Sequence, residues 1–184
     1  MSGCRLNSPR LQLRAPQAGD VRAVMPLIGD YEVAKNLSSV PHPYSQGDWF
    51  ELLERAQGGY ARGTDFTFAV VRRSDNVLMG MCGAHWRDGG LFEIGYWLGR
   101  PYWGEGFATE AARRVAAFAF HDLKVETLIA GYFADNPASG RVLAKLGFAP
   151  NGVQTKDSRA RKGPVECHMM VLPRENFGRR RIAA

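Results

Sequence analysis

The spacing of hydrophobic and polar residues predicts a strand and then two helices in the first third of the chain. Leu11-Gln12-Leu13-Arg14 alternates, as a half-buried strand does. Asp20 precedes apolar residues at helical spacing within 21–30, so it is expected to cap a helix. A second helix is predicted from Asp48, with Gly58-Gly59 as its end.

The middle of the chain changes to short apolar runs separated by turn formers. Phe66–Val71, Val77–Trp86 and Phe92–Leu98 are rich in aromatic and aliphatic residues, and Ser, Asp, Asn and Gly residues separate them. This pattern predicts three strands that are joined by hairpins.

Helices and strands alternate in the last part of the chain. The expected elements are a helix over Gly106–His121, a strand over Thr127–Phe133, a helix over Asn136–Leu146, a strand over Phe148–Val153, a basic loop, and a last strand over Val165–Leu172. Helices before and after a central mixed sheet indicate the α/β or α+β class. We expect one domain over 1–184, with its core at about 11–177 and short tails.

Composition and length agree with a soluble globular protein. The chain has 184 residues, of which 45% are hydrophobic and 23% are charged. No apolar run approaches the roughly 18 residues of a membrane span, and the first residues lack the apolar core of a secretory signal. A cytoplasmic protein is expected, and a homodimer is left open.

The cysteines do not suggest a metal site or a disulfide framework. Cys4, Cys82 and Cys167 are far apart, and no His lies near them at a ligand spacing. We interpret Cys82 and Cys167 as small buried apolar residues.

The net charge is +6, and this value alone excludes few classes of function. Much of it lies in two clusters, the first made of Lys156, Arg159, Arg161 and Lys162, and the second of Arg179-Arg180-Arg181. Nucleic-acid binding is disfavoured, because no basic stripe has aromatic residues interleaved with it.

The segment from Glu93 to Ala112 is the most informative about function. A strand ends at Leu98, a short turn holds Gly104 and Gly106, and a helix starts at once. Glycines let main-chain N–H groups converge, and a helix N-terminus adds unpaired donors, so the turn suits a diphosphate. A tight turn without a ligand remains the alternative. The third glycine of a dinucleotide fingerprint is replaced by Thr109, and no P-loop lysine follows.

Two motifs resemble the GCN5-related N-acetyltransferase (GNAT) superfamily, in particular its ribosomal-protein alanine acetyltransferase branch (RimJ/RimL-like). The first motif runs from Gly95 to Leu98 and from Pro101 to Ala111. The second comprises Asn136-Pro137-Ala138-Ser139 and Lys145-Leu146-Gly147-Phe148. One departure is Pro101, where the wider superfamily has Gln or Arg.

The resemblance implies a mostly antiparallel mixed sheet that splays open between its fourth and fifth strands, with acetyl-CoA in the gap. It also implies the cofactor contacts. The residues are Tyr96, Trp97, Leu98, Trp103, Gly104, Glu105, Gly106, Phe107, Ala108, Thr109, Asn136, Ser139, Arg141 and Lys145. A solvated helix face is the alternative for Arg141 and Lys145, and a plain helix cap is the alternative for Asn136.

Acetyl transfer to an amine needs a base for the amine and a proton for the leaving thiolate. Many members of the superfamily use a tyrosine seven residues after the motif asparagine, where this chain has Leu143. The resemblance implies that Ser139 replaces it. We rank Glu93 first and Glu166 second as the base, with His85 and His168 behind them.

The expected function is an acetyl-CoA-dependent N-acetyltransferase without a metal. The acceptor is a primary amine, either a protein N-terminus or a small molecule. Its pocket is expected near the loop 40–45 and the hairpin 156–162, with Tyr44, Trp49, His85 and Trp86 as lining candidates. The alternative function is a non-catalytic module that senses acetyl-CoA or serves in an assembly.

Overall fold

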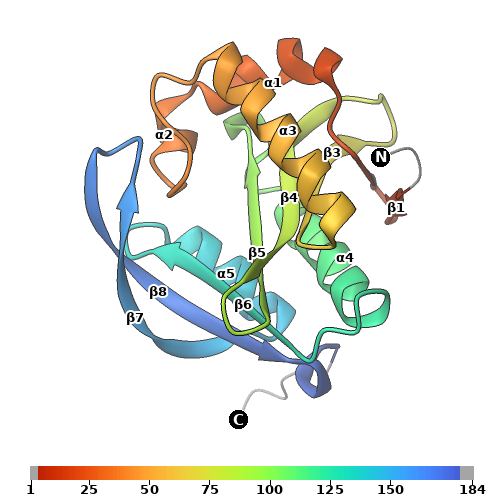
Figure 1. Ribbon diagram of the computed structural model, residues 1–184, viewed down its shortest axis with the longest axis vertical. Helices are drawn as coiled ribbons and strands as arrows, with labels where there is room; N and C mark the ends of the chain where they lie inside the picture. Colours follow the sequence, from red (N-terminus) through yellow and green to blue (C-terminus); the bar gives the residue numbers. More distant parts are fainter. Residues whose placement is uncertain (1–3, 179–184) are drawn as a thin grey trace.

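Eight strands form one sheet in this computed structural model, which describes residues 4–178 (Figure 1). The sheet order is β1-β2-β3-β4-β5-β6-β8-β7, and all neighbours are antiparallel except β5 and β6. The strands are β1 (Leu6–Asn7), β2 (Leu11–Arg14), β3 (Asp65–Arg72), β4 (Leu78–Arg87), β5 (Leu91–Leu98), β6 (Thr127–Phe133), β7 (Ala149–Ser158) and β8 (Gly163–Pro173). The expected fold class is confirmed.

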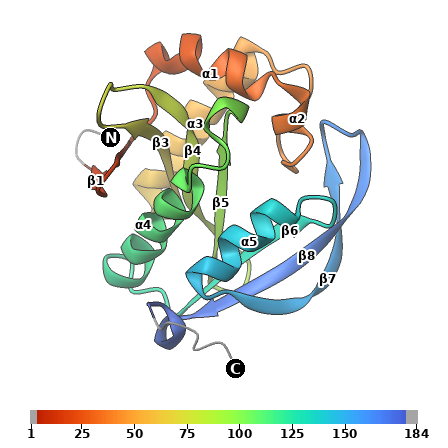
Figure 2. The ribbon, with the colours of Figure 1, turned by 180° about the vertical axis from the view of Figure 1, so that it is seen from behind.

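Helices cover both faces of the sheet. They are α1 (Val21–Ile28), α2 (Tyr31–Ala34), α3 (Gln46–Arg62), α4 (Phe107–His121) and α5 (Pro137–Leu146), with short 3-10 turns at Ala18–Asp20, Arg100–Tyr102 and Arg174–Asn176. α1 and α3 lie on one face, and the view from behind shows α4 and α5 on the other (Figures 1 and 2). We call these the α3 face and the α5 face.

Each face of the sheet has its own hydrophobic core. On the α3 face, Trp49 is fully buried against Ala69 and Met81 of the central strands. On the α5 face, a larger core joins α4 and α5 to the sheet and includes Phe68 and Leu143. Burial on two faces explains why β3 and β4 are apolar along most of their length, without strict alternation.

Gly58-Gly59 does not end the second predicted helix, so that prediction is wrong. α3 continues to Arg62 and ends at Gly63. A Cβ on Gly59 would lie 2.2 Å from the Cβ of Asp65. Gly59 therefore allows the close approach of α3 to the start of β3, and it does not act as a stop signal.

Asp20 does not cap α1 with its side chain, which is a second correction. Its carboxylate accepts from the main-chain N–H of Gln17 and forms an ion pair with Arg14 at 2.7 Å. The stretch after Phe148 also differs from the prediction, because β7 extends to Ser158 and forms a hairpin with β8 that includes the expected basic loop. The pattern did not predict β1 or α2.

None of the helices within residues 4–178 is long and apolar enough to cross a bilayer. The Arg179-Arg180-Arg181 cluster lies outside the described residues.

Candidate active site

The sheet opens between β5 and β6, the fourth and fifth of the strands expected from the sequence. These two strands pair only at Phe92–Leu128 and Glu93–Ile129. Beyond Glu93, β5 keeps β4 on one side and loses β6 on the other (Figure 1). The side chains of Tyr96 and Trp97 are accordingly half-buried. The predicted splay is present, and it leaves a strand edge open to a ligand.

The turn that follows β5 has the conformation expected of an anion site. Gly104 and Gly106 both lie in the left-handed region, at φ +82° and +79°. No side chain caps the first turn of α4 within the described residues. Its leading N–H groups therefore remain available to a ligand at the positive end of the helix dipole. The indole Nε1 of Trp103 donates to the Leu98 carbonyl at 2.7 Å and fixes the start of the turn.

The β1–β2 turn supports the other side of the first turn of α4. Glu110 accepts from the Ser8 hydroxyl at 2.7 Å, the Arg10 N–H at 2.8 Å and the Arg10 Nε at 2.6 Å. Burial would raise the pKa of Glu110, but these bonds and the Arg10 charge outweigh it and lower the pKa. Arg10 also donates to the Glu105 carbonyl at 3.0 Å. Glu110 is thus committed to structure.

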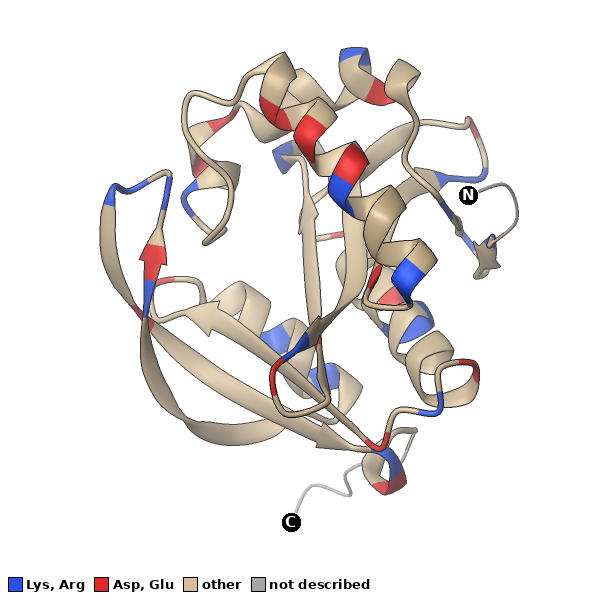
Figure 3. Cartoon of the chain, viewed as in Figure 1, with Lys and Arg blue, Asp and Glu red and all other residues tan. Residues whose placement is uncertain are grey.

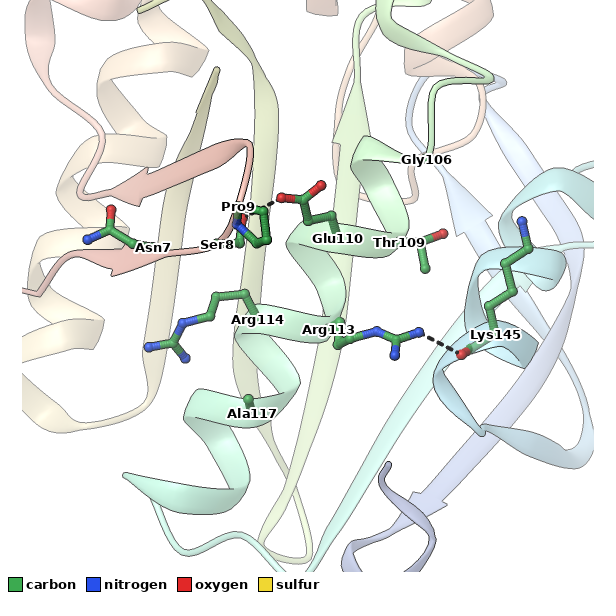
Figure 4. A pocket seen from close by; sticks show the side chains of 10 residues that line it. All are labelled: Asn7, Ser8, Pro9, Gly106, Thr109, Glu110, Arg113, Arg114, Ala117 and Lys145. Carbon is green, nitrogen blue, oxygen red and sulfur yellow. Dashed lines mark hydrogen bonds between the residues drawn. The ribbon is translucent and has the colours of Figure 1, made fainter. Parts of the chain in front are cut away.

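A cavity of about 620 Å³ lies along α4, beside this turn (Figure 4). Figure 4 shows Thr109 and Arg113 on the side of α4 that faces Lys145 of α5, and Ser8 with Glu110 on the other side. Arg113 donates to the Lys145 carbonyl at 3.1 Å. Lys145, one of the predicted phosphate contacts, therefore lies next to the turn, while Arg141 lies exposed on α5 and does not line the cavity.

The open strand and α5 meet through a pair of hydroxyl groups. The Tyr96 hydroxyl lies 2.9 Å from the Ser139 Oγ and donates to the Ser139 carbonyl at 3.0 Å. Asn136 caps α5 by accepting from the Ser139 N–H at 3.2 Å. Burial raises the pKa of Tyr96, so its phenol keeps its proton. The structure thus brings three predicted site residues together beside the opening.

The two carboxylates that the sequence ranks as candidate bases have different surroundings. Glu93 forms ion pairs with Arg87 at 2.7 Å and with Lys156 at 3.0 Å. Burial alone would raise the pKa of Glu93, but the charge and hydrogen bond of Lys156, followed by those of Arg87, lower it. The Glu166 side chain is 62% exposed and lies 3.6 Å from His168. The register places Glu93 on the α3 face and Glu166 on the α5 face.

His85 lies on the α3 face, opposite Glu93 in the register of β4 and β5. Its Nδ1 is 3.1 Å from the Oδ2 of Asp65. The other aromatic candidates for the acceptor pocket are separated from it. Trp49 is buried in the core, so its prediction as a lining residue is wrong. Trp86 is 43% exposed, and strand alternation puts it on the opposite face from His85.

The basic hairpin of β7 and β8 docks on the loop after α2. Arg159 donates its main-chain N–H to the Ser38 carbonyl at 3.0 Å, and Arg161 donates Nε to the Lys35 carbonyl at 2.7 Å. Arg161 also binds Asp135 through two nitrogens. Figure 3 shows Lys and Arg residues, in blue, at the tip of the β7–β8 hairpin. The cluster is thus partly neutralised and holds the two sides of the opening together. Tyr44 lines a small pocket in this region with Arg159.

Cys82 and Cys167 are buried, as the sequence predicts, and burial raises the pKa of each thiol. Within residues 4–178, no group of three or more His, Cys, Asp or Glu side chains is arranged to hold a metal ion.

Similarity to known proteins agrees with this geometry. The acetyltransferase (GNAT) domain family matches residues 10–149. The chain is 26% identical to the uncharacterized N-acetyltransferase p20 of Bacillus licheniformis, over 94% of this chain and 97% of the relative. It is 29% identical to the uncharacterized N-acetyltransferase YoaA of Bacillus subtilis, over 92% of this chain and 98% of the relative.

Solved structures share the fold over almost the whole chain. A GNAT-family acetyltransferase from Bacillus anthracis has a TM-score of 0.81 and 23% identity, with 94% of this chain and 99% of that chain covered. A ribosomal-protein-S5-alanine acetyltransferase from Vibrio fischeri has a TM-score of 0.80 and 18% identity, with 96% of this chain and 100% of that chain covered. RimJ of Mycobacterium smegmatis, in complex with CoA-disulfide, has a TM-score of 0.80 and 17% identity, with 96% of this chain and 88% of that chain covered.

The family match covers more than half of the chain, and the full-length relatives are named N-acetyltransferases. This protein therefore belongs to the GNAT acetyltransferase family and is an acetyl-CoA-dependent N-acetyltransferase.

Proposed function

We propose that the protein acetylates a primary amine, with the N-terminal amine of a protein as its leading acceptor. The support comes from the structural relatives, since the Vibrio fischeri enzyme is named for alanine of ribosomal protein S5. A small-molecule amine is the second candidate. A polyamine is disfavoured by the net charge of +6, because like charges repel in the encounter.

The observation that carries the proposal is the turn at the start of α4 beside an open strand edge. The main-chain N–H groups from Trp103 to Ala108 would bind the diphosphate of acetyl-CoA, with Thr109 beside them. A Cβ on Gly104 would meet nothing within 4 Å, so the turn is not filled by the protein itself. Lys145 and Arg141 supply positive charge from α5 for the phosphates of the nucleotide.

The pantetheine arm fits the part of β5 that β6 leaves. An extended chain there would add to the sheet edge through the main-chain groups of Trp97 and Leu98. The Leu98 carbonyl also accepts from the indole N–H of Trp103. Asn136 would reach the arm from the start of α5. The thioester, which supplies the activated acetyl group, would then lie near Ser139.

Ser139 is the proposed proton donor to the thiolate. Its hydroxyl is held at 2.9 Å by Tyr96, across the opening. Glu93 and Glu166 remain the bases predicted from the sequence. Glu93 is held by two cations, and Glu166 is mostly exposed on the other face. The two cations lower the pKa of Glu93, which makes it a weak proton acceptor.

A transfer assay tests the acceptor. Peptides with varied first residues, together with small-molecule amines, are offered with acetyl-CoA, and thiol release and mass increase are followed. We expect transfer to peptide N-termini. Transfer to small molecules alone would contradict the leading acceptor, and no transfer to any amine would contradict the function.

A matched pair of variants tests the cofactor site. Gly104 and Gly89 have the same φ of +82°, and a Cβ would meet nothing within 4 Å at either position. Gly104→Val and Gly89→Val therefore carry similar backbone strain. Only Gly104→Val should weaken CoA binding in calorimetry, by roughly 100-fold, because it removes several charge-assisted hydrogen bonds. Equal affinities would remove the turn from the site.

A further inference from the structure

One row of residues crosses three strands on the α3 face. Asp65 of β3, His85 of β4 and Glu93 of β5 are direct partners in the register. Glu93 is also the last residue of β5 that pairs with β6. The row therefore ends where the sheet begins to open.

The first pair in this row fixes the protonation of the imidazole. His85 Nδ1 is 3.1 Å from Asp65 Oδ2, while Thr67 donates to the other carboxylate oxygen at 2.6 Å. Burial would raise the pKa of Asp65, but the hydrogen bond and charge of His85 and the bond from Thr67 lower it, so Asp65 is a carboxylate. A carboxylate only accepts, so Nδ1 bears the hydrogen and Nε2 of the neutral ring has a free lone pair.

The next row of the sheet leaves room for this ring. It consists of Thr67, Gly83 and Gly95, in register across the same strands. A Cβ on Gly83 would lie 2.8 Å from His85 Nε2, and a Cβ on Gly95 would lie 3.7 Å from it. The imidazole thus lies over two glycines, with Nε2 directed along the sheet toward the open part of β5.

This position meets the requirements of a base for the acceptor. Gly95 is the first residue of β5 on this face beyond the last pair with β6. The His85 side chain is 24% exposed, so a ligand has access to it. No group within residues 4–178 forms a hydrogen bond with Nε2. Glu93, in contrast, has both carboxylate oxygens engaged, one by Arg87 and one by Lys156.

We propose that His85 is the base that takes the proton from the acceptor amine, and that Asp65 is a positioning residue that holds its ring. This inference rests on the proposed function. It assigns the base to a residue that the sequence ranks behind both carboxylates.

The proton balance of the reaction is complete with this assignment. Nε2 takes one proton from the acceptor ammonium, and the freed lone pair forms the C–N bond to the acetyl carbonyl. The C–S bond breaks, and its electron pair leaves on sulfur. Ser139 gives a proton to that sulfur and regains one from the new amide nitrogen. The imidazolium then releases its proton to water, so the net products are the amide, CoA and one proton.

Charged groups lie on both sides of His85 on the α3 face. Asp65 and Glu93 lie on either side of it, and Arg55 of α3 acts on Asp65. Arg87 and Lys156 lie beyond Glu93 and neutralise it. Asp65 is therefore the carboxylate that remains free to hold the ring of His85 through Nδ1.

His85→Gln tests the base, with His121→Gln as its control. His121 is an exposed residue at the end of α4. We expect His85→Gln to lower kcat roughly 10-fold at pH 7, and to recover above about pH 9, where an α-amino acceptor is already neutral. His121→Gln should match the wild type. A His85→Gln variant that folds, binds CoA normally and stays within threefold of the wild type would overturn the proposal, as would a larger loss in Glu93→Gln.

A measurement without turnover tests Asp65. In ¹⁵N NMR of the wild type at pH 8, Nε2 should be the unprotonated nitrogen of His85. Asp65→Asn should reduce that preference and lower kcat at pH 7. A wild type with the hydrogen on Nε2 would overturn the assignment. If the wild type acetylates no amine, the proposed function fails instead, while this NMR result stands on its own.

Discussion

The two faces of the open part of β5 differ in their chemistry. On the α5 face, Tyr96 and Ser139 form a neutral pair of hydroxyls beside the first turn of a helix. On the α3 face, Asp65, His85 and Glu93 form a row of carboxylates around an imidazole. The first set has protons to give, and the second set can take one.

Strand geometry explains how both sets lie so close together. Successive side chains of a strand point to opposite faces, so Gly95 and Tyr96 serve different faces although they are neighbours. A fully paired sheet would separate the two faces. The loss of β6 beyond Glu93 opens an edge at which a bound thioester would meet both. The comparison suggests that one face donates a proton to sulfur and the other removes a proton from nitrogen.

Ser139→Ala breaks the donating face and should have the largest effect. We expect kcat to fall about 100-fold, because the thiolate loses its proton donor. The affinity for acetyl-CoA should stay nearly unchanged, since the main-chain bond to Asn136 is kept. Steady-state kinetics and calorimetry measure the two quantities. A variant as fast as the wild type would remove Ser139 from the acid role.

Gly83→Ala tests whether the α3 face needs the His85 ring in its present place. We expect it to lower kcat about 10-fold. The new Cβ would lie within 3 Å of both His85 Nε2 and the Phe66 carbonyl, so the ring must move. Gly95→Ala is the matched control, because its Cβ would meet His85 at an ordinary 3.7 Å. Melting temperatures separate a displaced ring from a weakened sheet. Equal kcat values would show that the place of the ring does not matter.

Local patterns were sufficient to predict most of the fold. Alternation and turn formers give the three central strands within a few residues, and the glycines of the turn predict where an anion would bind. Gly59 was misread because a glycine that allows a close approach has the same local signal as one that ends a helix. The pattern also missed β1 and α2, which are too short for a period to emerge.

The electrostatic setting of the site was beyond sequence reasoning. Lys156 neutralises Glu93 from 63 residues away, and it comes from the edge strand β7, which the sheet order separates from β5 by two strands. Likewise Asp65 meets His85 only because the β3–β4 register puts them opposite one another. Knowledge of the β3–β4 register alone would have revealed the Asp65–His85 pair. It would not have revealed the Lys156–Glu93 pair, whose strands are not neighbours in the sheet.

Tyr96→Phe weakens the donating face without removing the donor. The hydroxyl of Tyr96 holds the Ser139 side chain across the opening, and one such bond contributes about 1 kcal/mol. We therefore expect kcat to fall roughly fivefold, with little change in CoA affinity. If Tyr96→Phe cost as much as Ser139→Ala, the phenol itself would be the donor.

Glu93→Gln should have the smallest effect on catalysis, less than about threefold in kcat, if Glu93 is structural. The substitution should instead lower the free energy of unfolding, because Lys156 and Arg87 lose a charged partner. We expect a loss of about 1 kcal/mol at pH 7, or roughly 2–4 °C in Tm. The matched control is Glu126→Gln, whose side chain is 78% exposed in its pair with Arg174 and should cost little.

The pH dependence of that loss decides whether the ion pairs cause it. The pKa of Glu93 is lowered in the folded chain, so the carboxylate contributes stability above its ordinary value of 4.5 and loses it as the pH falls through the folded value. The difference in Tm between wild type and Glu93→Gln should thus be full at pH 7 and shrink below about pH 4. Thermal melts at both values measure it. A difference that stays constant with pH would mean that packing, and not charge, explains the role of Glu93 on this face.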